Sequence, residues 1–74
     1  MITPGTYRHY KGNDYQVIGL ARHSETEQTL VIYRALYGAC DLWARPLEMF
    51  GEKIWVEGNL VPRFLRIDEE NSEP

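Results

Sequence analysis

Two glycine–asparagine dipeptides, each set between short strand-like segments, constrain the fold of this chain more than any other feature. Gly12-Asn13 follows the aromatic segment 7–11. Gly58-Asn59 separates segment 54–57 from segment 60–63. Both residue types tolerate the positive φ values of tight hairpin turns. The chain is therefore predicted to reverse direction at both places and to form antiparallel β-structure.

Further segments rich in β-branched and aromatic residues predict the remaining strands, at 15–21, 29–37 and 42–45, and residues 64–67 close the ordered part. Gly19, in the middle of its segment, indicates a bend. Pro46 suits the first position of a helical turn over residues 46–50, which Gly51 can end. Pro62 places its strand at a sheet edge or at a bulge.

These elements predict a mostly β fold, specifically a small SH3-like antiparallel barrel of five or six short strands with one helical turn near residues 46–50. Residues 1–67 form a single domain, and residues 68–74 an acidic tail that is predicted to be disordered. With 74 residues and nine aromatic rings, the chain can build a small core largely from aromatic side chains. The expected core residues are Val17, Ile32, Leu36, Met49 and Phe64.

Charge and cysteine usage point to a cytoplasmic protein with no membrane association. Cys40 is the single cysteine and cannot form an internal disulfide. No cationic leader and no apolar run of membrane-spanning length is present. The net charge is −3, but residues 68–74 contribute four acids, so residues 1–67 carry seven acids against eight bases. Nucleic acid is therefore a possible partner that the total charge does not favour.

Catalytic and metal-binding patterns are weak, so the chain is predicted not to be an enzyme and to need no metal or cofactor. Cys40 could pair with His9 or His23 as nucleophile and base, but the adjacent Asp41 would raise the pKa of its thiol. The two histidines, the cysteine and the acids of the loops lack metal-ligand spacing. The glycines mark separate turns and form no phosphate-binding loop.

The segment Arg22-His23-Ser24-Glu25-Thr26 combines charges, an imidazole and hydroxyls in one predicted hairpin loop. It could be a recognition loop in which Arg22 or His23 contacts an anionic group. The alternative is a self-satisfied loop, in which the hydroxyls bond the backbone and Glu25 pairs with an arginine. Both interpretations stay open at this point.

A second candidate surface alternates arginine with aromatic residues over two neighbouring strands. Period-two alternation places Tyr33 and Tyr37 on one face, opposite Arg34, and places Trp43 and Arg45 together on the next strand. Rings beside guanidinium groups suit single-stranded nucleic acid, a proline-rich peptide or an anionic small molecule. The alternative is cross-strand aromatic packing covered by arginine side chains.

Several motifs in fixed order resemble a known family. They are Tyr7-Arg8-His9-Tyr10-Lys11-Gly12, Ala21-Arg22-His23-Ser24-Glu25-Thr26, Val31-Ile32-Tyr33-Arg34-Ala35-Leu36-Tyr37-Gly38, Trp43-Ala44-Arg45-Pro46-Leu47-Glu48-Met49-Phe50 and Pro62-Arg63-Phe64. The chain resembles the small bacterial proteins of the domain of unknown function 1653 (DUF1653), from Gly5 to Ile67. The resemblance implies an SH3-type β-barrel and assigns no activity, ligand or functional residue.

The leading functional hypothesis is a non-enzymatic binding or adaptor module for an anionic or peptide ligand. Its contact surface would comprise Arg22, His23, Glu25, Tyr33, Arg34, Tyr37, Trp43 and Arg45. The alternatives are a domain that binds single-stranded RNA or DNA and an accessory domain of a nucleotide-processing enzyme. A protein or an anionic small molecule is thus the expected partner, and the sequence leaves the oligomeric state open.

Overall fold

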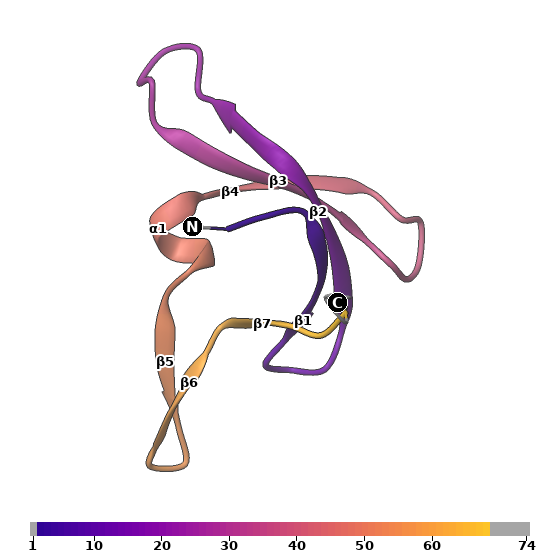
Figure 1. Cartoon of the computed structure of the whole chain (residues 1–74), viewed down its shortest axis with the longest axis vertical. Helices are drawn as coiled ribbons and strands as arrows, with labels where there is room; N and C mark the ends of the chain where they lie inside the picture. The colour runs from indigo at the N-terminus through magenta and orange to yellow at the C-terminus, as the bar shows by residue number, and fades with distance from the viewer. Residues whose placement is uncertain (1, 69–74) are drawn as a thin grey trace, which may run out of the picture.

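The computed structural model describes residues 2–68, and the mostly β prediction is confirmed. Seven strands and one helical turn follow one another along the chain (Figure 1). They are β1 (Gly5–His9), β2 (Asp14–Arg22), β3 (Thr29–Ala35), β4 (Leu42–Pro46), α1 (Leu47–Phe50), β5 (Lys53–Val56), β6 (Asn59–Pro62) and β7 (Phe64–Arg66).

The strands form two antiparallel sheets. Five of them pair in the order β4-β3-β2-β1-β7, and β5 pairs only with β6 in a separate hairpin. Strand β7 returns to β1, so the last strand of the described chain pairs with the first. Strand β3 lies between β2 and β4, as expected for a strand with two apolar faces. Within residues 2–68 no ladder joins β4 to β7, so the backbone hydrogen bonding does not close into a ring.

Both predicted chain reversals are present, although the second turn lies one residue earlier than its dipeptide suggested. At the first, the N–H of Gly12 donates to the carbonyl of His9 at 2.7 Å. At the second, Val56 pairs with Asn59, which leaves Glu57 and Gly58 as the two loop residues with φ of 50° and 84°. Positive φ at both central residues is the signature of a type I′ turn, whose twist suits a hairpin.

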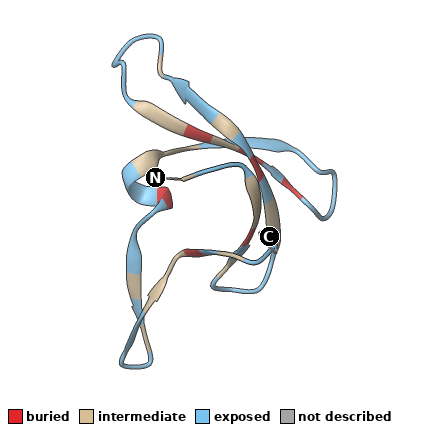
Figure 2. Cartoon of the chain, viewed as in Figure 1, coloured by how far each residue is buried: buried red, intermediate tan, exposed pale blue. Residues whose placement is uncertain are grey.

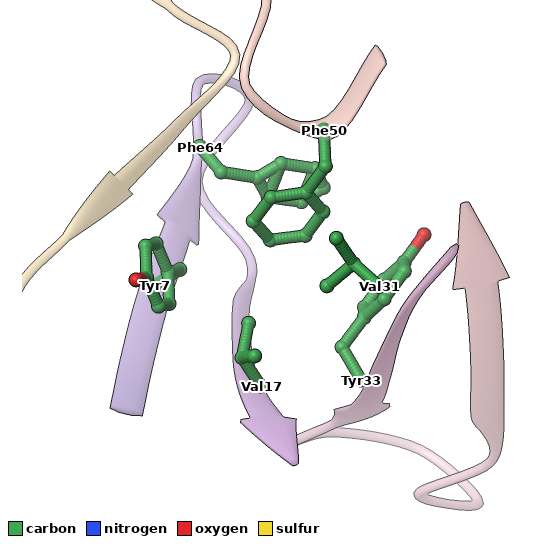
Figure 3. Close-up of a cluster of buried hydrophobic side chains, with 6 residues drawn as sticks. All are labelled: Tyr7, Val17, Val31, Tyr33, Phe50 and Phe64. Atoms are coloured by element: carbon green, nitrogen blue, oxygen red, sulfur yellow. The ribbon is translucent and has the colours of Figure 1, made fainter. Parts of the chain in front are cut away.

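The core lies on one face of the five-stranded sheet, and α1 contributes Phe50 to it (Figure 3). The rings of Phe50 and Phe64 stack with centroids 4.1 Å apart and an interplanar angle of 11°. The buried hydrophobic residues are Tyr7, Val17, Val31, Tyr33, Ala35, Phe50 and Phe64. The core is therefore mainly aromatic.

The expected core was right at two positions and wrong at two. Val17 and Phe64 are buried, whereas Leu36 and Met49 are 45% and 46% exposed, and Ile32 is half-buried. The faces alternate along β3, so Ile32 points away from the core that Val31 and Tyr33 enter. Leu36 lies beyond the end of β3, and on α1 the ring of Phe50 takes the inward position instead of Met49.

A β-bulge accompanies the bend predicted at Gly19. Val17 pairs with Tyr33 and Gly19 with Ile32, so Ile18 is an extra residue in β2. A bulge strengthens local twist and bends the strand. No helix within residues 2–68 is long and apolar enough to cross a membrane. Of the predicted tail, Asp68 bonds Arg66 at 2.8 Å, and residues 69–74 lie outside the described part.

Candidate functional site

The pairing of β3 with β4 brings two of the predicted site residues to the face of the sheet that carries the core. Trp43 lies opposite Tyr33, and Arg45 lies opposite Val31. Residues two apart on a strand share a face, so the indole and the guanidinium stand side by side on the inner face. Because β4 is an edge strand, Trp43 is still 53% exposed and Arg45 is half-buried.

Arg45 is held in place by aromatic groups. Its Nε donates to the hydroxyl of Tyr33 at 3.3 Å, and its guanidinium lies 5.6 Å from the centroid of the Phe64 ring. No carboxylate forms an ion pair with Arg45 among residues 2–68. The stem and Nε of the Arg45 side chain are therefore fixed, and the positive charge of its guanidinium is not neutralised by a neighbouring carboxylate.

A row of tyrosines extends this arrangement toward the loop after β3. The hydroxyls of Tyr15 and Tyr37 are 2.6 Å apart, and the ring of Tyr15 meets those of Tyr37 and Tyr33 edge-on, with centroids 5.5 and 5.4 Å away. Tyr33 itself is only 5% exposed, so its ring belongs to the core. We refer to one set of residues as the tyrosine–arginine face: Tyr15, Tyr33, Tyr37, Trp43 and Arg45.

The surroundings of Tyr15 on this face disfavour the ionised form of its hydroxyl. Burial and the neighbouring hydroxyl of Tyr37 raise the pKa of Tyr15 to about 12, although Arg45 acts in the opposite direction. At neutral pH Tyr15 therefore remains a neutral hydroxyl, able to donate or accept a hydrogen bond.

Positive charges also gather around His9, next to the face. The imidazole packs edge-on against Phe64 with centroids 4.9 Å apart. Burial, followed by the charges of Arg45, Arg63 and Lys11, lowers the pKa of His9. Arg63 is paired with Glu52 at 3.2 Å, while its buried Nε has no hydrogen-bond partner among the described residues. The surroundings of His9 thus favour its neutral imidazole ring, and the electrostatic potential that the nearby cationic side chains create there is positive.

Sequence reasoning missed Tyr15 as a member of this face, and His9 and Arg63 as its neighbours. Each lies on a strand or connection remote in sequence from β4, and no short motif links them. The one available signal was the alternation of β2, which placed Tyr15 on the same face as Val17 before the bulge. Their convergence on Arg45 depends on the register of β1, β2 and β7, which the sequence pattern does not specify.

The predicted recognition loop connects β2 to β3, near the end of β3 that pairs with Arg45, and is largely occupied by its own hydrogen bonds. Nδ1 of His23 accepts the backbone N–H groups of Glu25 and Thr26 at 3.1 and 3.3 Å. Arg22 donates to the carbonyl of Glu27 at 3.2 Å. The alternative of a self-satisfied loop describes this geometry, except that no arginine pairs with Glu25 among residues 2–68.

Arg34 and Cys40 are also separate from the tyrosine–arginine face. Arg34 points to the other face of β3 and donates to the carbonyl of Cys40 at 2.9 Å, which ties the loop after β3 to the strand. Cys40 is exposed, and its Sγ contacts the carbonyl of Gly38 at 3.9 Å. Within the described residues no three metal-ligating side chains come together.

The fold and the site together define a small antiparallel β domain with a cationic, aromatic inner face. The family model that matches is that of DUF1653, described as proteins of unknown function, and the match spans residues 5–66. The chain belongs to this family, which confirms the resemblance inferred from its motifs.

A solved structure supports the same assignment. The chain is similar to a DUF1653 protein from Bordetella bronchiseptica, whose crystal structure is known, with 35% sequence identity and a TM-score of 0.84. The similarity covers 97% of this chain and 95% of that one. A search of curated proteins gives no match.

Proposed function

We propose that this chain is a non-enzymatic binding module that holds an anionic ligand on the tyrosine–arginine face. The observation that carries the proposal is the state of Arg45. Its guanidinium is fixed against the Phe64 ring and the Tyr33 hydroxyl, and it has no acidic partner among residues 2–68. A fixed guanidinium loses little side-chain entropy when it binds a carboxylate or a phosphate.

The neighbours of Arg45 suggest the rest of the ligand. Trp43 offers a half-exposed indole on the same face, and Tyr37 adds a ring that is 44% exposed. A ligand with an anionic group beside a planar or apolar part can bond the guanidinium and stack on these rings. Acidic peptides with an adjacent aromatic or proline residue have this chemistry, as do nucleotides.

The alternatives differ in what the ligand belongs to. Single-stranded nucleic acid would use Trp43 and Tyr37 as stacking platforms and Arg45 as a phosphate contact. An accessory role beside a nucleotide-processing enzyme would use the same contacts for a free nucleotide. The peptide or small-molecule ligand is preferred because the chain carries a net charge of −3, which opposes a long polyanion.

The test is an NMR titration of the labelled full-length chain with three probes: inorganic phosphate, a nucleoside monophosphate and an acidic peptide containing a tryptophan. We expect amide shifts to cluster at Tyr15, Tyr37, Trp43 and Arg45 for at least one probe. Arg45→Gln should weaken its binding roughly tenfold or more, because a hydrogen bond to a charged group is lost. A titration with oligothymidylate examines the nucleic-acid alternative.

Arg8→Gln is the matched control, since it removes the same charge from the other face of the sheet, on β1, three strands away from β4. It should change the affinity by no more than about twofold, because exposed charges at that separation are screened. Shifts that cluster on the loop around His23 instead, or an affinity that Arg45→Gln leaves unchanged, would contradict the proposal.

Two further properties of the chain are part of this proposal. We infer an SH3-like barrel from the way β3 and β7, at the two sides of the sheet, both contribute to one core with α1. Backbone hydrogen-exchange and NOE data that connect β4 with β7, the two edges of the five-stranded sheet, would support closure. We also infer a cytoplasmic location, since the exposed Cys40 is unpaired and suits a reducing compartment.

A further inference from the structure

The hairpin of β5 and β6 is the least supported part of the molecule. It leaves the five-stranded sheet after α1 (Figure 1), and it contains no buried residue (Figure 2). A two-stranded hairpin by itself is marginally stable in water. Its apolar side chains are nevertheless numerous, with Trp55 71% exposed and Leu60 51% exposed.

One face of the hairpin is turned toward the body of the protein. Val56 and Val61 line a groove of about 460 Å³ that the end of β1 and Leu65 close on its other side. Trp55 and Leu60, which pair with each other across the ladder, lie on the opposite face. One face of the hairpin thus lines the groove, whereas the face that carries Trp55 is not covered by any other described residue.

The free edge of β5 carries a defined set of backbone groups. The carbonyl of Glu52 accepts the N–H of Arg63 at 2.9 Å, so position 52 faces the partner strand. Hydrogen-bonded and non-hydrogen-bonded pairs alternate along an antiparallel ladder, so Ile54 and Val56 also bond toward β6. Lys53 lies opposite Pro62, which has no N–H to donate, as this alternation requires. The N–H and C=O groups of Lys53 and Trp55 therefore point outward, along the edge that no strand covers within residues 2–68.

The sequence of this edge is complementary to itself when read in the reverse direction. Residues 53–57 are Lys-Ile-Trp-Val-Glu. A second copy laid antiparallel about Trp55 would place its Glu57 opposite Lys53, its Val56 opposite Ile54 and its Trp55 opposite Trp55. Opposite charges and β-branched pairs at facing positions stabilise an antiparallel ladder, and like charges there destabilise it.

We propose that β5 is a homodimerisation edge, at which two copies pair antiparallel about Trp55 to join their hairpins into one four-stranded sheet. The two-fold axis passes through the pair of Trp55 residues, whose outward N–H and C=O groups bond each other reciprocally. The two ion pairs between Lys53 and Glu57 of the other copy fix the register. Glu57 lies in the turn just after β5, with a φ of 50°, where it also lines the groove, so the pairing requires its side chain to turn from the groove toward Lys53 of the other copy.

This interface is independent of the proposed ligand site. Strand β5 and the edge strand β4 belong to different sheets, so pairing through β5 leaves Trp43 and Arg45 free. Because the edge of β5 pairs with the same edge of the second copy, the dimer has two-fold symmetry, which is the commonest symmetry of homo-oligomers.

The test is sedimentation equilibrium of the full-length chain over micromolar to millimolar concentrations. We expect a reversible monomer–dimer equilibrium with a dissociation constant in the micromolar range. Lys53→Glu places a carboxylate opposite Glu57 of the other copy at each of the two contacts and should weaken the dimer roughly tenfold. Glu57→Lys should weaken it to a similar extent.

Mixing the two variants provides the decisive measurement. K53E and E57K each repel themselves and attract each other, so an equimolar mixture should form a heterodimer at concentrations where either variant alone is monomeric. The double variant K53E/E57K should dimerise as the original chain does. Lys11→Glu is the matched control, because it reverses the other lysine of the chain away from β5 and should leave the dimer unchanged.

Circular dichroism of each variant separates loss of pairing from loss of folding. Trp55→Pro removes the central outward N–H while leaving the bonds to β6 intact, so it should yield a folded monomer. A chain that is monomeric at millimolar concentration overturns the proposal, and the lysine at the edge then protects a monomer from aggregation. A dimer that neither charge reversal weakens overturns it as well.

Discussion

Both histidines of the chain accept backbone hydrogen bonds at Nδ1. His9 accepts the N–H of Lys11 at 3.1 Å, and His23 accepts the N–H of Glu25 at the same distance. An accepting Nδ1 requires an unprotonated nitrogen, so the proton of the neutral ring resides on Nε2. The sequence suggested His9 or His23 as a catalytic base and His23 as a contact for an anion. In the structure, both histidines instead stabilise backbone turns.

The environment of His9 makes folding depend on pH. Its pKa is lowered in the folded protein, chiefly by burial and then by Arg45, Arg63 and Lys11, so the unfolded chain binds a proton at a higher pH than the folded one. The stabilisation is complete above the unfolded value of about 6.5 and is lost as pH falls through the folded value. Urea denaturation from pH 7.5 to pH 5 should therefore show a decreasing free energy of unfolding.

His9→Asn tests the origin of this pH dependence. The asparagine side chain can accept the same N–H of Lys11 and does not titrate, so the decrease between pH 7.5 and pH 5 should shrink. The pKa values of Asp14 and Asp68 are also lowered, by hydrogen bonds from Arg8 and Arg66, but they act below about pH 4 and leave this window unaffected. An equal decrease in both proteins would assign the effect to other groups.

At the scale of elements, the single turn α1 is anchored to the core by one aromatic ring. Of its four residues only Phe50 is buried, and that ring stacks on Phe64 and meets Tyr7 and Tyr33 edge-on with centroids 5.6 and 5.3 Å apart. A helix this short has little stability of its own, so the ring holds the turn in place rather than the reverse.

Removing that ring should destabilise the whole domain. Phe50→Ala should lower the free energy of unfolding by about 3–5 kcal/mol, as for other buried aromatic residues. Met49→Ala, on the same turn but 46% exposed, should cost about 0.5 kcal/mol. Thermal and urea denaturation measure both values. Similar costs for the two variants would mean that α1 is not packed as described.

At the scale of the whole molecule, the distribution of charge bears on ligand binding. Residues 69–74 contain three of the eleven acidic residues and no base, so ending the chain after Asp68 changes the formal net charge from −3 to 0. Anion binding at Arg45 is opposed by the negative total, because the summed field of a protein acts on an approaching ligand.

Truncation after Asp68 should consequently tighten the binding of an anionic probe, by roughly twofold at low salt. The difference should disappear at about 0.5 M salt, where the Debye length falls below the distance between separate surface charges. Calorimetric titration at two salt concentrations measures the effect, and unchanged urea denaturation confirms that the truncated chain is intact. A salt-independent difference would point to a direct contact instead.

The sequence by itself determined which segments become strands, where the chain turns and where one helical turn forms. These features depend on neighbouring residues: the positive φ that Gly12 and Gly58 accept, the fixed φ of Pro46, and runs of β-branched and aromatic side chains. Strands β1 to β6 begin within two residues of their predicted positions, whereas β7 is a seventh strand beyond the five or six predicted. The family assignment rests on the same local motifs.

Only the tertiary structure decided which side chains share a face and what they meet. A shift of one residue in register moves a strand's side chains to the other face, and the bulge at Ile18 makes such a shift within β2. It is the pairing of strands that buries Tyr33, separates Arg34 from Arg45 and brings His9 to the same ring of Phe64 that Arg45 covers. Local sequence specifies extended backbone, whereas the orientation of each residue follows from hydrogen bonds between segments that are distant in the chain.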